Sequence, residues 1–185
     1  MRHPAARLDG GAASARNWRM PSASRHDAAV AALDAYEPKT VLEVGCGHGV
    51  AVRLLLARPD IVRVTALDRS AKMIAAVAAS APEALASGRL ALRAEPLEAA
   101  DFGGERFDAI IAVNVDFNLR LGERWPGLLK SLLQPGGVIA LAFEPPPGSG
   151  KGEAFSSLSR QRLEAAGLAV GIEKVAGNVT VILAR

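Results

Sequence analysis

The sequence contains a single cysteine, Cys46, and no long uninterrupted run of apolar residues. One cysteine cannot form an internal disulfide, and it cannot supply a cluster of thiolate metal ligands. The longest apolar runs have the length of a strand and are bounded by charged residues, so we expect no membrane-spanning helix. A lone thiol suits a reducing compartment, and we therefore expect a cytoplasmic protein.

Basic charge is concentrated at the N-terminus, although the pI of the whole chain is about 9.4. Residues 1–26 hold five arginines and one acid, whereas the remaining 159 residues hold 17 basic and 18 acidic groups. A nearly neutral body argues against nucleic acid as a partner. We expect residues 1–25 to form a flexible or loosely docked basic arm, with an over-long start or an organelle transit peptide as alternatives.

The rest of the chain has the length and pattern of one domain. Its 185 residues are enough for a single substantial core, which we place at 26–185. Strand-like and helical apolar spacings alternate along it. We expect strands at 40–45, 61–68, 89–95, 107–114, 137–144, 168–175 and 178–184. We expect helices at 26–36, 49–57, 70–80, 124–133 and 152–166.

This alternation is typical of the doubly wound α/β fold. Several central strands are apolar on both faces, which predicts burial between two layers of helices. Only Ala176 and Gly177 separate the last two strands, and a parallel crossover needs a dozen residues or more. We therefore predict a Rossmann-like, mostly parallel sheet of seven strands with an antiparallel C-terminal strand and helices on both faces.

The stretch VLEVGCGHG places three glycines, spaced two apart, where the first strand ends. Ligands of open α/β sheets bind outside the carboxyl ends of the strands. Gly45, Gly47 and Gly49 permit backbone angles and a close approach that side chains would forbid. The dinucleotide fingerprint G-x-G-x-x-G fails, because Val50 stands where its third glycine should be. The loop thus predicts a nucleotide-derived ligand but does not identify which one.

An acidic residue follows the second strand at Asp68, 19 residues after Gly49. A carboxylate at this place can accept hydrogen bonds from a ribose diol. VLEVGCGHG, ALDRSAKMI and LLQPGGVIALAFE occur in this order. Together they resemble class I S-adenosylmethionine-dependent methyltransferases, in which an acid precedes a G-x-G-x-G loop, a D-x-S-x-x-M/L stretch follows, and an L-x-P-G-G turn precedes the fifth strand. The resemblance covers about 26–185.

The resemblance implies S-adenosylmethionine as cofactor and S-adenosylhomocysteine as product. The residues that it places at the cofactor are Glu43, Gly45, Cys46, Gly47, His48, Gly49, Asp68, Arg69, Met73, Glu95, Pro96 and Asn114. Glu43 and the glycines would line the methionine end, and Asp68 would hold the ribose hydroxyls. Met73 and Glu95 would lie near the adenine, although this chain reads AEP where the family often reads G-D-A. Asn114 would stand beside the transferred methyl.

The acceptor must be inferred from residues outside the glycine loop. A sulfonium methyl is already activated, so the protein mainly aligns the acceptor in line and excludes water. A general base helps when the acceptor is a hydroxyl, thiol or acidic carbon, and the candidates are Asp116 and Glu144, ahead of His48 and His26. The sequence NVDF at 114–117 differs from the [DNS]-P-P-[FYW] sequence of family members that methylate base amines. We expect a small-molecule acceptor, with O-, N- and C-methylation all open.

Two alternatives stay open at this point. One is a non-catalytic, methyltransferase-like partner protein that binds the cofactor, because no catalytic base is unmistakable. The other is an NAD-dependent oxidoreductase, which shares the glycine turn and Asp68 but not the glycine spacing. The body offers no large insertion for a cap domain, so the N-terminal arm, the first helix and the loop at 116–126 would recognise the acceptor. A monomer and a homodimer are both compatible with the sequence.

Overall fold

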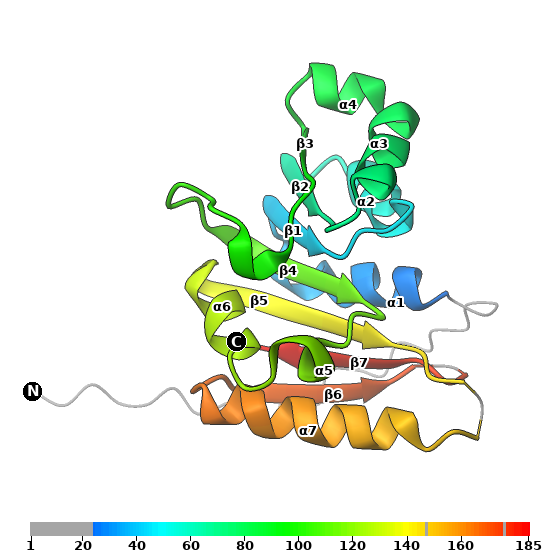
Figure 1. The fold of residues 1–185 in the computed structure, drawn as a ribbon, viewed down its shortest axis with the longest axis vertical. Coiled ribbons are helices and arrows are strands. Elements are labelled where there is room, and N and C mark those ends of the chain that lie inside the picture. The colour runs from blue at the N-terminus through cyan, green and yellow to red at the C-terminus, as the bar shows by residue number, and fades with distance from the viewer. Residues whose placement is uncertain (1–23, 147, 176) are drawn as a thin grey trace, which may run out of the picture.

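The computed structural model describes residues 24–146, 148–175 and 177–185, and their core is a seven-stranded sheet (Figure 1). The strands lie in the order β3-β2-β1-β4-β5-β7-β6. Their bounds are β1 Thr40–Val44, β2 Arg63–Leu67, β3 Leu90–Arg93, β4 Phe107–Val113, β5 Leu133–Phe143, β6 Val170–Lys174 and β7 Thr180–Ala184. Strand β7 is antiparallel to both β5 and β6, and the other neighbours are parallel. The predicted doubly wound fold with a reversed C-terminal strand is confirmed.

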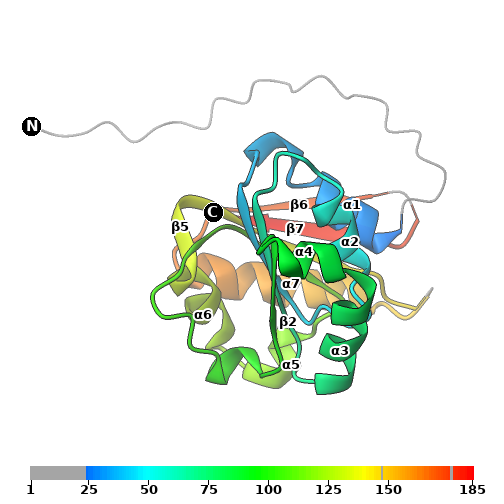
Figure 2. The ribbon, with the colours of Figure 1, turned by 90° about the horizontal axis from the view of Figure 1, so that it is seen from above.

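Helices cover both faces of this sheet (Figures 1 and 2). They are α1 Arg25–Ala31, α2 Val50–Leu56, α3 Ala71–Ser80, α4 Pro82–Ala86, α5 Phe117–Leu121, α6 Trp125–Ser131 and α7 Lys151–Ala165. Val41 of β1 packs with α1, α2 and α3, while its neighbour Leu42 packs with α5, α6 and α7. Because successive side chains of a strand point to opposite faces, one apolar strand serves two cores. This explains why the central strands are apolar on both faces.

Three details differ from the sequence prediction. The expected helix at 26–36 ends at Ala31, and a short 3-10 turn, Asp34–Tyr36, follows it. Strand β5 begins at Leu133 rather than at 137, because Leu133 still pairs with Phe107 before an irregular step in the register. Helices α4 and α5 were not predicted, since each spans only five residues and is too short to show a helical period.

Helix α1 brings the beginning of the described chain to the carboxyl end of the sheet. Ser24 caps the helix, and its hydroxyl and the Asp27 carboxylate form a capping box. The first residue of α1 anchors the helix, because Arg25 Nη1 lies 2.8 Å from Oε2 of Glu144, which directly follows β5. The expected arm at 1–25 lies outside the described residues except for Ser24 and Arg25. Among the described helices, none is long and apolar enough to cross a membrane.

Candidate functional site

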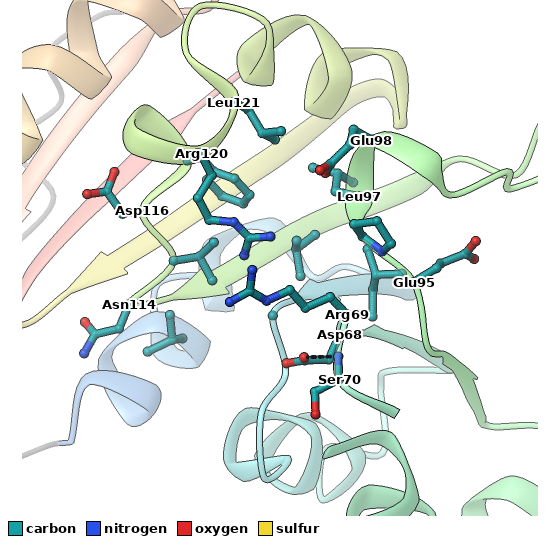
Figure 3. A pocket seen from close by; sticks show the side chains of 17 residues that line it. Asp68, Arg69, Ser70, Glu95, Leu97, Glu98, Asn114, Asp116, Arg120 and Leu121 are labelled. Atoms are coloured by element: carbon teal, nitrogen blue, oxygen red, sulfur yellow. Dashed lines mark hydrogen bonds between the residues drawn. The ribbon is translucent and has the colours of Figure 1, made fainter. Parts of the chain in front are cut away.

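A cavity of about 400 Å³ opens where β1, β2, β3 and β4 end (Figure 3). Residues that follow these four strands form most of its wall, and helix α5 closes one side. Carboxyl ends of adjacent parallel strands meet at one edge of a sheet, which is where ligands of this architecture bind. A larger hollow of about 750 Å³ between α6 and α7 is lined largely by helix residues. The cavity at the strand ends is therefore the candidate site.

Of the glycine loop after β1, Gly45 lines the cavity, whereas Glu43 and the predicted residues at 46–49 lie outside its wall. Gly45, Gly47 and Gly49 all have positive φ, at 74°, 50° and 71°. A Cβ atom added to Gly45 would lie 2.6 Å from a methyl group of Val115, so this glycine lets β1 and β4 approach closely. A Cβ on Gly47 would meet no described atom within 4 Å, so it is the positive φ that favours glycine at this position. The predicted loop conformation thus fits close contact with a bound molecule.

Asp68 joins the glycine loop to the start of α3. Its Oδ2 accepts a hydrogen bond from the Gly47 amide at 2.9 Å, and its Oδ1 accepts one from the Ser70 amide at 2.9 Å. Ser70 itself caps α3 through its side chain, so Asp68 is not that cap. Each carboxylate oxygen has more than one acceptor site, and both can still receive a hydroxyl group. Asp68 lines the cavity, as a ribose-binding role requires (Figure 3).

Glu43 is a buried acid with an unpaired oxygen. The residue is 2% exposed, and its Oε2 has no hydrogen-bond partner among the described residues. Burial raises the pKa of this carboxyl to about 8, although the Val52 amide and the charge of Arg53 act in the opposite direction. An isolated buried carboxylate is unfavourable, but a cation beside it removes the penalty. Glu43 therefore fits a ligand that brings a positive charge, such as an amino acid ammonium group.

The two polar residues inside the glycine loop have different surroundings. Cys46 is buried, and burial together with the nearby Glu43 and Asp68 raises the pKa of its thiol to about 12. A thiol with this pKa stays protonated and acts as a small apolar group rather than as a nucleophile. His48 is exposed, and its carbonyl accepts a hydrogen bond from Arg53 at 2.9 Å. Only its backbone is thus engaged with the loop.

The segment after β3 forms the wall opposite the glycine loop. Glu95 and Pro96 both line the cavity, followed by Leu97. The Glu95 carboxylate makes an ion pair with Arg93 at 3.1 Å, and Figure 3 shows it pointing away from Asp68. The predicted adenine contact through this carboxylate would therefore require a change of rotamer. Met73 lies half-buried on α3, and the cavity wall formed by the described residues does not include it.

The ends of β4 and β5 hold the remaining predicted residues. Asn114 lines the cavity with φ of 55°, and its Oδ1 accepts a hydrogen bond from the Glu144 amide at 2.8 Å. Asp116 also lines the cavity, and its Oδ1 caps α5 by accepting the Leu119 amide at 3.0 Å. Glu144 is paired with Arg25 and lies beside the cavity rather than in its wall. Of the two candidate bases, Asp116 is the one that the cavity contains.

The sequence prediction assigned 116–126 to a loop that recognises the acceptor, and it missed the helix α5 within this segment. Phe117, Arg120 and Leu121 line the cavity from this helix, and Figure 3 shows the Arg120 side chain directed into it. The sequence does contain signals for the two ends of this helix, because Asp116 is a good N-cap and Gly122 is a typical helix stop. A five-residue helix between two such signals does not produce a recognisable period.

Comparisons with known proteins agree with this geometry. A sequence model described as "Methyltransferase domain" matches residues 41–137, which is more than half of the chain. A search of curated proteins gave no significant match. Among solved structures, the methyltransferase domain of bacterial CtHen1 superposes with a TM-score of 0.70 at 16% identity, covering 86% of this chain and 96% of the other.

Two further structures show the same fold. The DhpI protein, solved as a complex with SAM and HEP, has a TM-score of 0.68 at 21% identity and covers 85% of this chain and 84% of its own. The N-methyltransferase NodS from Bradyrhizobium japonicum has a TM-score of 0.67 at 16% identity, with 87% and 93% covered. Identities this low establish the fold alone, and the family rests on the match of the sequence model. The chain belongs to the class I S-adenosylmethionine-dependent methyltransferase family.

Proposed function

We propose that this protein is an enzyme that transfers a methyl group from S-adenosylmethionine to a small-molecule acceptor. The observation that carries the proposal is the buried carboxyl oxygen of Glu43, which has no partner among the described residues and directly precedes the cavity-lining Val44 and Gly45. The methionine part of this cofactor bears an ammonium group, which is the kind of partner that the Glu43 carboxyl needs. NAD carries no ammonium group, so the buried acid favours the methyl donor over the dinucleotide.

The residues that would hold the cofactor follow from the geometry. Glu43 and the glycine loop at 45–49 would lie at its methionine end, Asp68 would bind its ribose, and 95–97 would contact its adenine. When bound, the cofactor supplies an electrophilic methyl group on a positively charged sulfur. Asn114 is held in place by the Glu144 amide, so it presents a fixed amide at the edge of the cavity. A fixed group of this kind can orient an acceptor for in-line attack.

Asp116 is the better placed of the candidate bases. Its Oδ1 is used in capping α5, and its second oxygen is available to receive a proton from a hydroxyl or thiol acceptor. Glu144 is paired with Arg25 and lies outside the cavity wall. We therefore assign proton removal to Asp116 where the acceptor requires it, and orientation to Asn114.

A small-molecule acceptor is supported by the volume of the cavity and by the charge of the protein body. The cavity of about 400 Å³ is in the range of small-molecule sites, and the body of the chain is nearly neutral. The solved structures with this fold include one titled as an N-methyltransferase and one bound to SAM together with HEP. We propose that α1 covers the acceptor side, because Arg25 is paired with Glu144 beside Asn114.

A second candidate is a cofactor-binding partner protein without activity. It is favoured by the fact that Asp116 and Glu144 both make structural contacts already. Calorimetric titration with S-adenosylhomocysteine and with NAD, followed by a methyl-transfer screen against small metabolites, separates the possibilities. Binding of S-adenosylhomocysteine with transfer supports the enzyme, and binding without transfer to any acceptor supports the partner protein. Binding of NAD alone would contradict both.

A further inference from the structure

Two arginines line the candidate site from different elements. Arg69 directly follows Asp68 at the end of β2, and Arg120 lies on α5. Figure 3 shows their guanidinium groups pointing toward one another across the cavity. Within the described ranges, neither side chain makes an ion pair or a hydrogen bond. Both residues are exposed, so their guanidinium groups are accessible to a ligand.

This lack of partners is unusual in this chain. Most of the other described arginines have a carboxylate, carbonyl or ring partner: Arg25, Arg53, Arg58, Arg63, Arg89, Arg93, Arg106, Arg160, Arg162 and Arg185. Two like charges that face one another repel, and the repulsion is relieved when an anion lies between them. A guanidinium group binds carboxylate and phosphate oxygens through parallel, charge-assisted hydrogen bonds.

None of the acids described in the cavity wall makes an ion pair with Arg69 or Arg120. Asp68 accepts two backbone amides, Glu95 is paired with Arg93, and Asp116 caps α5. Glu98 is the fourth acid of the wall, and it also lines the hollow between α6 and α7. The four acids outnumber the two arginines of the wall, so an anion would be bound by the facing guanidinium groups themselves rather than by a net positive charge of the cavity.

We propose that Arg69 and Arg120 together bind an oxyanion of the methyl acceptor, so that the substrate class is a small carboxylate or phosphate compound. The inference rests on the proposed function. Arg120 lies on α5, four residues after Asp116, the N-cap of this helix, and both residues line the cavity. Residues at this spacing lie on one face of a helix, about one turn of 5.4 Å apart. An acceptor anchored by its anion at Arg120 therefore presents its reactive atom near Asp116.

The arrangement also separates this anion from the cofactor carboxylate. The methionine end of the cofactor belongs at Glu43 and the glycine loop, whereas Arg120 comes from α5 on the opposite side of the cavity. Arg69 adjoins the ribose-binding Asp68 and can contact the cofactor through its backbone, while its guanidinium group reaches toward Arg120 (Figure 3). Arg120 is consequently the residue whose loss distinguishes acceptor binding from cofactor binding.

The test uses the full-length protein saturated with S-adenosylhomocysteine and, in parallel, the cofactor-free protein. Inorganic phosphate and acetate are titrated by calorimetry at constant ionic strength, so that screening does not change. The variants are Arg120→Gln, Arg69→Gln and Arg120→Lys, and the control is Lys72→Gln, an exposed residue of α3 with the same change of charge. Exposure of these side chains makes misfolding of the variants an easily checked and minor concern.

We expect phosphate, acetate or both to bind the loaded wild type, and preference for one identifies the anion. Arg120→Gln should weaken that binding by about tenfold, the worth of one charge-assisted contact at an exposed site, and leave the S-adenosylhomocysteine affinity within about twofold. Arg120→Lys should recover part of the lost anion affinity, because lysine restores the positive charge but not the planar group that donates two parallel hydrogen bonds. Lys72→Gln should bind both ligands as the wild type does.

Three results would overturn the inference while the proposed function stands. These are binding of S-adenosylhomocysteine with no binding of either anion, displacement of the anion by S-adenosylhomocysteine, and an equal loss of both affinities in Arg120→Gln. If S-adenosylhomocysteine does not bind the wild type, the proposed function fails separately. The titration of the cofactor-free protein then decides the arginine site, which is refuted if neither anion binds or if Arg120→Gln binds as the wild type does.

Discussion

Binding of the cofactor product should release a proton from Glu43. Burial raises the pKa of this carboxyl to about 8 in the free protein, so about nine-tenths of it is protonated at pH 7. An ammonium group placed beside Glu43 favours the carboxylate form and lowers this pKa. The affinity for S-adenosylhomocysteine should therefore rise with pH, by about tenfold between pH 6 and pH 7, and level off above pH 8.

The raised pKa of Glu43 also makes the folded protein less stable at neutral pH than at acidic pH. The folded pKa of Glu43 lies above the ordinary value of 4.5, so the folded protein holds this proton more tightly than the unfolded chain. The stabilisation that comes from protonated Glu43 is fully present below pH 4.5 and is lost progressively as the pH rises toward 8. At pH 7 the loss amounts to about 3 kcal/mol in the free energy of unfolding.

The measurement is calorimetric titration at pH 7 in two buffers of different ionisation enthalpy, with Glu43→Gln as the matched variant. The difference between the buffers gives the number of protons released, which should be close to one for the wild type and zero for Glu43→Gln. Urea unfolding of the free proteins between pH 5 and pH 8 should show a downward slope for the wild type relative to the variant. Equal proton release by both proteins, or none by the wild type, would refute the role of Glu43.

Three other predictions concern neighbouring parts of the site. Asp68→Ala should weaken S-adenosylhomocysteine binding by a few kcal/mol, measured by calorimetry, and an unchanged affinity would exclude ribose binding there. Gly45→Ala should cost about 3 kcal/mol more in urea unfolding than Gly104→Ala, because both glycines have positive φ but only the Gly45 Cβ would strike Val115; equal losses would contradict this. Deleting residues 1–23 should reduce acceptor turnover far more than S-adenosylhomocysteine affinity, and unchanged turnover would rule out a role for this segment.

The sequence was sufficient for the sheet and for the glycine loop. Apolar runs of strand length bounded by turn residues predict strands well, and all seven predicted strands appear in the structure. The connection before the last strand was predicted as two residues and spans 175–179 in the structure, and either length is too short for a crossover, so the reversal of β7 could be predicted. Asp68 could be placed at the glycine loop since both segments follow adjacent parallel strands, and the hydrogen bond from the Gly47 amide joins them.

The acceptor side of the site could not be predicted in the same way. Arg120 lies on a five-residue helix, and its approach to Arg69 depends on how that helix packs. The pairing of Glu95 with Arg93 depends on side-chain rotamers at the end of β3, which no spacing rule describes. The pairing of Glu144 with Arg25 depends on where α1 packs, which the sequence pattern does not specify. Contacts between distant segments decide these features, so they become visible only in three dimensions.

The two hydrogen bonds accepted by Asp68 order the glycine loop before any ligand binds. Its two oxygens hold the amides of Gly47 and Ser70, so the loops after β1 and β2 are already joined in the free protein. A loop that is ordered in advance loses little conformational entropy on binding, and more of the contact energy then appears as affinity. The Gly47 amide should accordingly exchange its hydrogen slowly with solvent even without ligand, so the loop is prepared by folding rather than by binding.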